Sequence, residues 1–296
     1  MNIELGKVRF IRGESGGKYP FNHSVYLKGD DCRVVIDPSC GFQKMKDLKH
    51  QKGVDQVWLS HWHEDHMAFL YLFENSTLRL SERDFPPLTD MEIFLDWYGI
   101  RDEALRAVWK DVMLKNFNYR PQKKALFFSD DEVIGLGGLR VSVIPTPGHT
   151  PGHLSFYFPD EEALFLGDYD LTTFGPWYGD VFSSIEDTIH SIRLLKSIPA
   201  RRWIASHNTG FFENNPGRLW DDYENVIYQR QEKILNFLQE PKTLEEIVSA
   251  WLIYGKPREP KAFFEFNERA LVVKHLEHLQ SKGAIRFDEN HYRKVS

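Results

Sequence analysis

The stretch HWHEDH, residues 61 to 66, places three imidazoles and two carboxylates in six consecutive positions. It directly follows the apolar residues 57 to 59, which are typical of a buried β-strand. Crowding such groups costs free energy unless a cation binds them, because each loses hydration and like charges repel. Imidazole and carboxylate together suit zinc, with iron and manganese as other occupants of this ligand type. The stretch therefore predicts a metal site at the end of a strand, and its alternative is a polar surface loop.

The order of the ligands divides them between two ions. The side chains of His61 and His63 stand two residues apart on an extended segment, so they point the same way, toward one ion. Asp65 and His66 lie farther along the turn and can reach a second ion. The stretch therefore predicts one half of a two-metal site.

Later strand ends supply the other half. His149, Asp168 and His207 each follow an apolar run that predicts a strand. Strand ends that open into loops are where α/β sheets place ligands, so we expect these three residues to meet the first group. His153 lies four residues past His149, and we expect it behind the ligands because the other positions already fill a two-metal site.

These motifs resemble the metallo-β-lactamase-fold hydrolase superfamily. The resemblance rests on the H-x-H-x-D-H loop, TPGHTPGH, LGD and a Ser-His pair after a strand, and it covers roughly residues 1 to 235. It implies an α/β fold, a four-layer αββα sandwich with the site at one edge of the two sheets, and two divalent ions, with Zn²⁺ as the expected metal. By this resemblance the first ion is held by His61, His63 and His149, the second by Asp65, His66 and His207, and Asp168 bridges them.

The pattern also predicts two domains. Residues 1–238 form the catalytic domain, with a helical insertion at about 88–116. Residues 239–296 predict helix, helix and hairpin, which resembles a winged-helix module. Ten basic and eight acidic residues give residues 241–296 a net charge of +2, and the whole-chain charge of −6 then leaves −8 for the remainder.

The expected chemistry is hydrolysis. Two ions about 3.5 to 4 Å apart would hold a water and lower its pKa toward about 7, which gives a metal-bridged hydroxide. Asp65 is the candidate catalytic residue, because its carboxylate can orient this water and accept its proton. The loop after Asp168 carries Tyr169, Trp177 and Tyr178, which we expect to form substrate-binding walls.

Several substrate classes fit this chemistry. The favoured one is a small-molecule ester, thioester or lactone, as in the glyoxalase-II-like branch of the superfamily. The alternative is a metal-dependent endoribonuclease or phosphodiesterase, since a ribonuclease branch has a similar layout. Nucleic acid is not favoured, because strand binding needs clustered basic residues and the main body is acidic. An iron-dependent sulfur dioxygenase-like enzyme and a DNA-binding sensor are further alternatives.

Composition predicts the class of protein and its cellular compartment. The 296 residues are 42% hydrophobic and 27% charged, which is typical of a globular protein. No apolar run approaches a membrane span of about 18 residues, and no signal peptide begins the chain. Two cysteines, Cys32 and Cys40, match no metal or disulfide framework. We expect a cytoplasmic protein without membrane contact, and a homodimer is the self-association to test.

Overall fold

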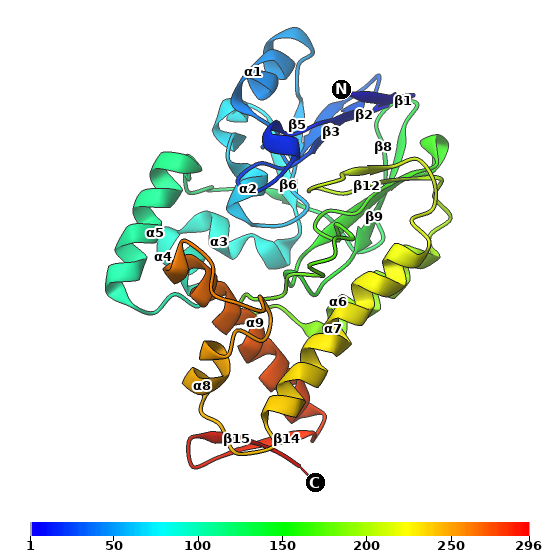
Figure 1. The fold of residues 1–296 in the computed structure, drawn as a ribbon. Helices are drawn as coiled ribbons and strands as arrows, with labels where there is room; N and C mark the ends of the chain where they lie inside the picture. Colours follow the sequence, from blue (N-terminus) through cyan, green and yellow to red (C-terminus); the bar gives the residue numbers. More distant parts are fainter. Residues whose placement is uncertain (1, 296) are drawn as a thin grey trace.

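The computed structural model describes residues 2–295 and consists mainly of two β-sheets with helices on their outer faces (Figure 1). The first sheet has the strand order β1-β2-β3-β4-β5-β6-β7. Its strands are antiparallel from β1 to β4 and parallel from β4 to β7. They are β1 (Ile3–Leu5), β2 (Val8–Ile11), β3 (Ser24–Lys28), β4 (Arg33–Ile36), β5 (Gln56–Trp58), β6 (Thr77–Leu80) and β7 (Leu126–Phe127).

The second sheet has the order β13-β12-β11-β10-β9-β8. All its neighbouring pairs are antiparallel except β11 and β12, which are parallel. The strands are β8 (Val133–Gly135), β9 (Arg140–Pro145), β10 (Leu154–Phe158), β11 (Ala163–Phe165), β12 (Arg202–Ile204) and β13 (Phe211–Phe212).

The two sheets pack face to face because their strands alternate apolar side chains toward a shared core. Val25, Ile36 and Trp58 of the first sheet lie in one buried cluster with Phe156 and Phe165 of the second. Burying such side chains contributes roughly 1.5–3 kcal/mol each. This cluster forms the interior of the sandwich.

Helices cover both outer faces. The first sheet packs against α1 (Phe42–Gln51) and α4 (Met91–Trp97), and the second against α6 (Ile185–Ser197) and α7 (Arg218–Phe237). The predicted αββα sandwich is therefore confirmed. The remaining helices of this part are α2 (Glu64–Met67), α3 (Pro86–Thr89), α5 (Glu103–Asn116), and the 3-10 turns η1 (Glu14–Gly16), η2 (Leu70–Phe73), η3 (Glu82–Asp84) and η4 (Pro159–Glu161).

The helical insertion predicted at about 88–116 contains α4 and α5, and the short helix α3 overlaps its start. Asp90 caps α4, since its carboxylate accepts the backbone N–H of Glu92 at 2.7 Å. Asp102 caps α5 in the same way through Leu105. None of the helices among residues 2–295 combines the length and apolar character needed to cross a bilayer.

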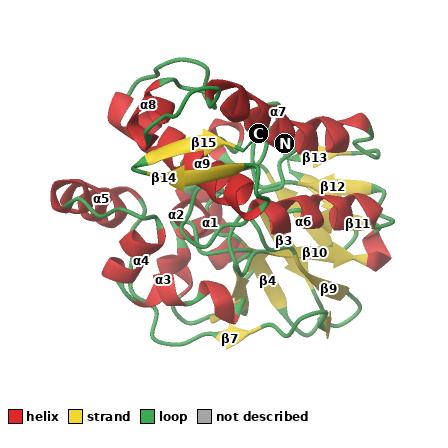
Figure 2. Ribbon diagram, turned by 90° about the horizontal axis from the view of Figure 1, so that it is seen from below, coloured by secondary structure: helices red, strands yellow, loops and turns green. Residues whose placement is uncertain are grey.

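The C-terminal part contains the predicted helices and hairpin: α8 (Leu244–Ser249), α9 (Lys261–Ser281), β14 (Ile285–Asp288) and β15 (His291–Lys294). Thr243 and Glu246 form a capping box at the start of α8. Leu271 and Val272 of α9 lie in the same buried cluster as Ile227 of α7. Figure 2 shows α9 and the hairpin across one end of the sheets, with α5 to one side. The winged-helix likeness of this part stays a prediction.

Candidate metal centre

The predicted ligands meet at one end of the sandwich because they follow strands that end there. His61 and His63 follow β5, Asp65 and His66 lie in α2, and the others follow β9, β11 and β12. Glycines precede two of these residues for steric reasons. Gly148 has a φ of 127°, and a Cβ there would lie 2.3 Å from the backbone nitrogen of Thr188. Gly167 has a φ of 61°, and its Cβ would lie 2.3 Å from the ring of His153. The TPGH and LGD motifs thus bring His149 and Asp168 close to packed neighbours.

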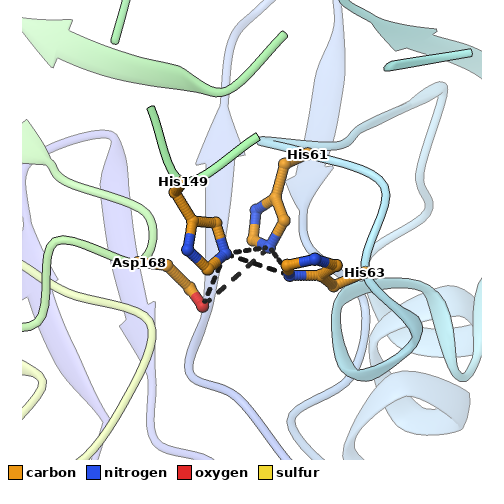
Figure 3. Close-up of side chains that lie close together, drawn as sticks. All are labelled: His61, His63, His149 and Asp168. Atoms are coloured by element: carbon orange, nitrogen blue, oxygen red, sulfur yellow. Dashed lines mark hydrogen bonds and ion pairs between the residues drawn. The ribbon is translucent and has the colours of Figure 1, made fainter. Parts of the chain in front are cut away.

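The first group consists of His61, His63, His149 and Asp168 (Figure 3). Nδ1 of His63 lies 3.0 Å from Nε2 of His61 and 3.0 Å from Nε2 of His149. The Nε2 atoms of His61 and His149 are 3.2 Å apart. Oδ2 of Asp168 completes the group at 3.4 Å from Nε2 of His149.

The second group consists of Asp65, His66 and His207. Oδ2 of Asp65 lies 3.4 Å from Nε2 of His207, and Oδ1 lies 3.9 Å from Nε2 of His66. Oδ1 of Asp168 faces this group, 3.0 Å from Nε2 of His66 and 3.4 Å from Nε2 of His207. Asp168 therefore presents one oxygen to each group, as a bridging ligand would.

Each histidine uses its other ring nitrogen to contact an acceptor. Nε2 of His63 donates to Oδ2 of Asp180 at 2.7 Å, and Nδ1 of His66 donates to Oδ2 of Asp37 at 2.9 Å. Backbone carbonyls accept from two more rings, with His149 bonded to Trp177 at 3.0 Å and His207 to Gly17 at 2.7 Å.

His61 is held less directly. The Ser60 hydroxyl donates its single proton to Asp37, so it accepts from Nδ1 of His61 at 2.9 Å. In its neutral form each ring therefore directs its N–H outward and presents a lone pair inward.

This arrangement fits divalent metal ions. The lone pairs that converge at 3.0–3.2 Å in the first group repel one another unless a cation lies between them. Zinc–nitrogen bonds of about 2.0–2.1 Å in a tetrahedral site place ligand nitrogens about 3.3 Å apart. The spacing in the first group is close to this value.

Buried charges shape the pKa values of the centre. Burial disfavours the imidazolium of His63, but the Asp180 carboxylate outweighs this effect and raises its pKa to about 9. Burial lowers the pKa of His149 to about 4. Burial, followed by repulsion from Asp65, raises the pKa of Glu64. Burial would raise the pKa of Asp168, yet the neighbouring imidazoles hold it well below its usual range. The centre thus combines the strongly ionised carboxylate of Asp168, in the bridging position, with the carboxyl group of Glu64, which resists ionisation.

A pocket of about 610 Å³ opens above these ligands. Its floor includes His63, Asp65 and Asp168, and its walls include aromatic residues from α5 and α9. A volume of this size accommodates a substrate of drug-like dimensions. Trp177 lines the pocket as the sequence predicts.

The structure places Tyr169 and Tyr178 elsewhere. Both side chains are fully buried outside the pocket lining. The Tyr169 hydroxyl donates to the carbonyl oxygens of Thr146 and Pro147, and the Tyr178 hydroxyl bonds Nε2 of His275 at 2.9 Å. The prediction that these two rings form pocket walls is therefore wrong, because the loop folds back and uses them for packing.

Sequence reasoning missed three carboxylates beside the ligands. Asp37 and Asp180 orient His66 and His63, and buried Glu64 accepts hydrogen bonds from Tyr98 and from Tyr19, the latter at 2.9 Å. Asp37 follows β4 at the same strand edge as the ligands, which was a usable signal. Asp180 lies in an irregular loop, where no local pattern marks it.

The sequence of this chain is similar to those of known hydrolases. The chain is 29% identical over 148 residues to a probable metallo-hydrolase of Streptococcus pyogenes serotype M6, which covers 49% of this chain and 60% of that protein. It is 27% identical over 183 residues to a hydroxyacylglutathione hydrolase of Hyphomonas neptunium, covering 61% and 59%. The chain thus spans about six tenths of the length of both relatives.

A solved structure shares the fold over nearly the whole chain. It is a metallo-beta-lactamase family protein of Thermus thermophilus, with a TM-score of 0.71, 22% sequence identity, and coverage of 98% of this chain and 99% of that one. The family model of the metallo-beta-lactamase superfamily matches residues 19–207, which include every predicted metal ligand. The chain therefore belongs to the metallo-beta-lactamase superfamily.

Proposed function

We propose that this protein is a metal-dependent hydrolase that holds two divalent ions, most suitably Zn²⁺, and cleaves a small ester, thioester or lactone. The observation that carries this proposal is the bridging position of Asp168, whose two oxygens face two ligand groups at the floor of one pocket. His61, His63 and His149 would hold one ion, and Asp65, His66 and His207 the other.

Ions bound in such a pair polarise a carbonyl oxygen and lower the pKa of water toward about 7. The chain's own groups supply the remaining steps. Asp65 lines the pocket, so its carboxylate can accept a proton from the attacking water and pass it to the leaving group. Asp37 and Asp180 fix the rings of His66 and His63, so the lone pairs keep their direction during turnover.

The pocket lining supports an ester or thioester more than a nucleic acid. Aromatic side chains dominate its walls, whereas Lys18 and Arg258 are its only lysine and arginine among residues 2–295. Tracking a phosphate backbone requires several cations in a row. The similarity to a hydroxyacylglutathione hydrolase, whose named substrate is an acyl derivative of a thiol, also supports this class.

The test is a panel of esters, thioesters, lactones and single-stranded RNA, assayed after metal analysis of the purified protein. We expect two zinc ions per chain and turnover of at least one carbonyl substrate. Asp65→Asn should reduce kcat by a factor of about 10²–10⁴, the usual contribution of a general base. His63→Ala gives the background, and His190→Ala is the matched control because His190 is an exposed histidine of α6.

Three results would contradict the proposal. Panel turnover no higher than that of His63→Ala would remove the hydrolase assignment. One iron per chain together with oxygen-dependent oxidation of a sulfur compound would replace hydrolysis by the dioxygenase alternative. Cleavage of the RNA that is lost in Asp65→Asn would instead favour the nuclease.

A further inference from the structure

We infer that the preferred substrate carries a bulky apolar group and a separate anionic group, and that Arg258 and Lys18 bind the anion. This inference rests on the proposed hydrolase function and concerns the upper part of the pocket. The two cations and the aromatic walls line the same cavity as the candidate metal ligands.

Two segments far apart in the sequence supply the aromatic side chains of the upper pocket. Trp109 of α5 faces Phe263 and Phe266 of α9, with ring centroids 6.4 Å apart in both pairs. Tyr98, which follows α4, stacks on Trp109 at 5.8 Å. All four rings line the pocket. The insertion and the C-terminal part therefore build one aromatic wall.

Tyr19 extends this wall at the pocket edge. Its ring lies 5.7 Å from Phe117 and 6.3 Å from Phe263, so it bridges the insertion and α9. A substrate as small as an acetyl ester would leave most of the 610 Å³ filled with water against aromatic rings. A bulky apolar group would displace that water and contribute roughly 25 cal/mol per Å² of buried surface. The walls therefore favour a large acyl or aryl group.

Two exposed cations, Lys18 and Arg258, belong to the pocket lining. Arg258 and Lys18 are solvent-exposed, and neither forms an ion pair with a carboxylate in the part of the chain that the structure describes. The guanidinium of Arg258 lies 5.2 Å from the ring centroid of Tyr254 and 5.8 Å from that of Phe264. Stacking on rings leaves the N–H edge of an arginine free to bind a carboxylate or phosphate.

The charges within the pocket are separated. The candidate metal ligands Asp65 and Asp168 lie at the pocket floor, whereas Lys18 and Arg258 are exposed to solvent. These exposed cations attract an anion on the substrate to the pocket mouth. This separation orients the substrate, with its anion at the mouth and its carbonyl free to reach the floor.

Four thioesters test both halves of the inference. The acyl half is acetyl or 4-phenylbutanoyl, and the thiol half is 3-mercaptopropanoate or its neutral amide. Water cleaves the C–S bond and yields a carboxylic acid and a thiol, and the thiol is measured with a chromogenic disulfide. We expect the highest kcat/KM for the phenylbutanoyl mercaptopropanoate.

Substitutions of Arg258 and Lys18 should change only the preference, in kcat/KM, for anionic over neutral thioesters. Arg258→Gln and Lys18→Gln should each lower kcat/KM for the anionic thioesters about fivefold, as for a partly exposed ion pair of about 1 kcal/mol. The neutral amides should change less than twofold. Arg258→Lys should recover part of the loss, and Arg286→Gln is the matched control because Arg286 is an exposed arginine of β14.

A binding measurement separates the two proposals. Non-hydrolysable thioether analogues of the acid and the amide are titrated against the tryptophan fluorescence of the pocket. Equal turnover of anionic and neutral thioesters would overturn the inference and leave the hydrolase function intact. Absent turnover, with Arg258-dependent binding of the acid alone, would refute the hydrolase function while the anion site stands. If the acid and the amide bind equally to the unaltered protein and to Arg258→Gln, the anion site is refuted.

Discussion

Replacement of Arg230 by methionine tests how the second sheet and its helices support the metal centre. Arg230 of α7 is buried, and among residues 2–295 it forms no ion pair. Its guanidinium donates to the carbonyl oxygens of Pro176 and Phe174, and to the Tyr178 hydroxyl at 2.9 Å. These contacts hold the loop whose Trp177 carbonyl accepts the ring N–H of His149.

The size of the effect follows from these contacts. Three hydrogen bonds from a charged donor contribute about 1.5–3 kcal/mol each, so their loss alone would cost about 5–9 kcal/mol. Methionine also removes the cost of burying an unpaired charge, which is several kcal/mol. We therefore expect a net loss of about 2–4 kcal/mol in the free energy of unfolding. Displacement of the loop should also weaken metal binding about tenfold, as for other groups that orient a ligand histidine.

Urea unfolding measures the first quantity, and competition with a chromogenic chelator measures the second. Arg218→Met is the control, because Arg218 lies on the same helix with an 88% exposed side chain. This variant should change the unfolding free energy by less than about 0.5 kcal/mol. Unfolding and metal affinity within error of the control would show that Arg230 does not hold the loop.

Three further outcomes are expected. Asp180→Asn should weaken one metal site about 10–100-fold in chelator competition, because Asp180 orients only His63; equal loss at both sites would contradict this. Metal removal by a chelator should lower the free energy of unfolding by about 2.7 kcal/mol for an ion present at 100 times its Kd, and Tm should fall with it. An unchanged Tm would count against resident ions. Burial, aided by Arg230, keeps the pKa of His275 well below its ordinary value. His275 is thus neutral in the folded protein, whereas in the unfolded chain it is protonated below about pH 6.5. Its contribution to the free energy of unfolding is therefore complete above that pH and falls by about 2 kcal/mol at pH 5. The acid loss should be about 2 kcal/mol smaller in His275→Gln, and an equal acid loss there would refute its origin in His275.

The clustering of the candidate metal ligands was predictable because each lies where local pattern and topology agree. The seven predicted residues all lie within one of the two ligand groups. An apolar run followed by His or Asp identifies a strand end without knowledge of the partner strands. His153 was also placed correctly behind the ligands, where its ring accepts the backbone N–H of Asp168 at 3.2 Å.

Elements that depend on tertiary contacts were harder to predict. The apolar periodicity of residues 268–282, ended by Gly283, predicts a helix over that range. In the structure α9 already begins at Lys261. Its polar residues Asn267, Glu268 and Lys274 are buried, since α9 contacts both the helices of the second sheet and the pocket. A helix buried on several sides lacks the one-sided apolar stripe that marks its start.

A similar shift occurs at the start of α6. The stretch Ser183-Ser184-Ile185-Glu186 predicts a capping box that begins at Ser183. In the structure Ser184 is the cap and accepts the backbone N–H of Asp187. Ser183 instead donates its hydroxyl to the carbonyl oxygen of His149 at 2.6 Å. Ser183 therefore contacts the candidate metal centre instead of capping the helix as the local pattern predicts.

The shared core of α9 constrains how this protein can change. The cluster beneath the second sheet includes Leu164 of β11, Ile227 of α7 and Leu271 of α9, so strand, connecting helix and C-terminal helix form one packed unit. The same α9 supplies the aromatic wall of the pocket. The C-terminal part thus cannot be exchanged or cut away as a cassette without opening the interior. Substitutions among the pocket side chains of α9 can change the shape of the pocket, whereas loss of the whole helix would expose this core.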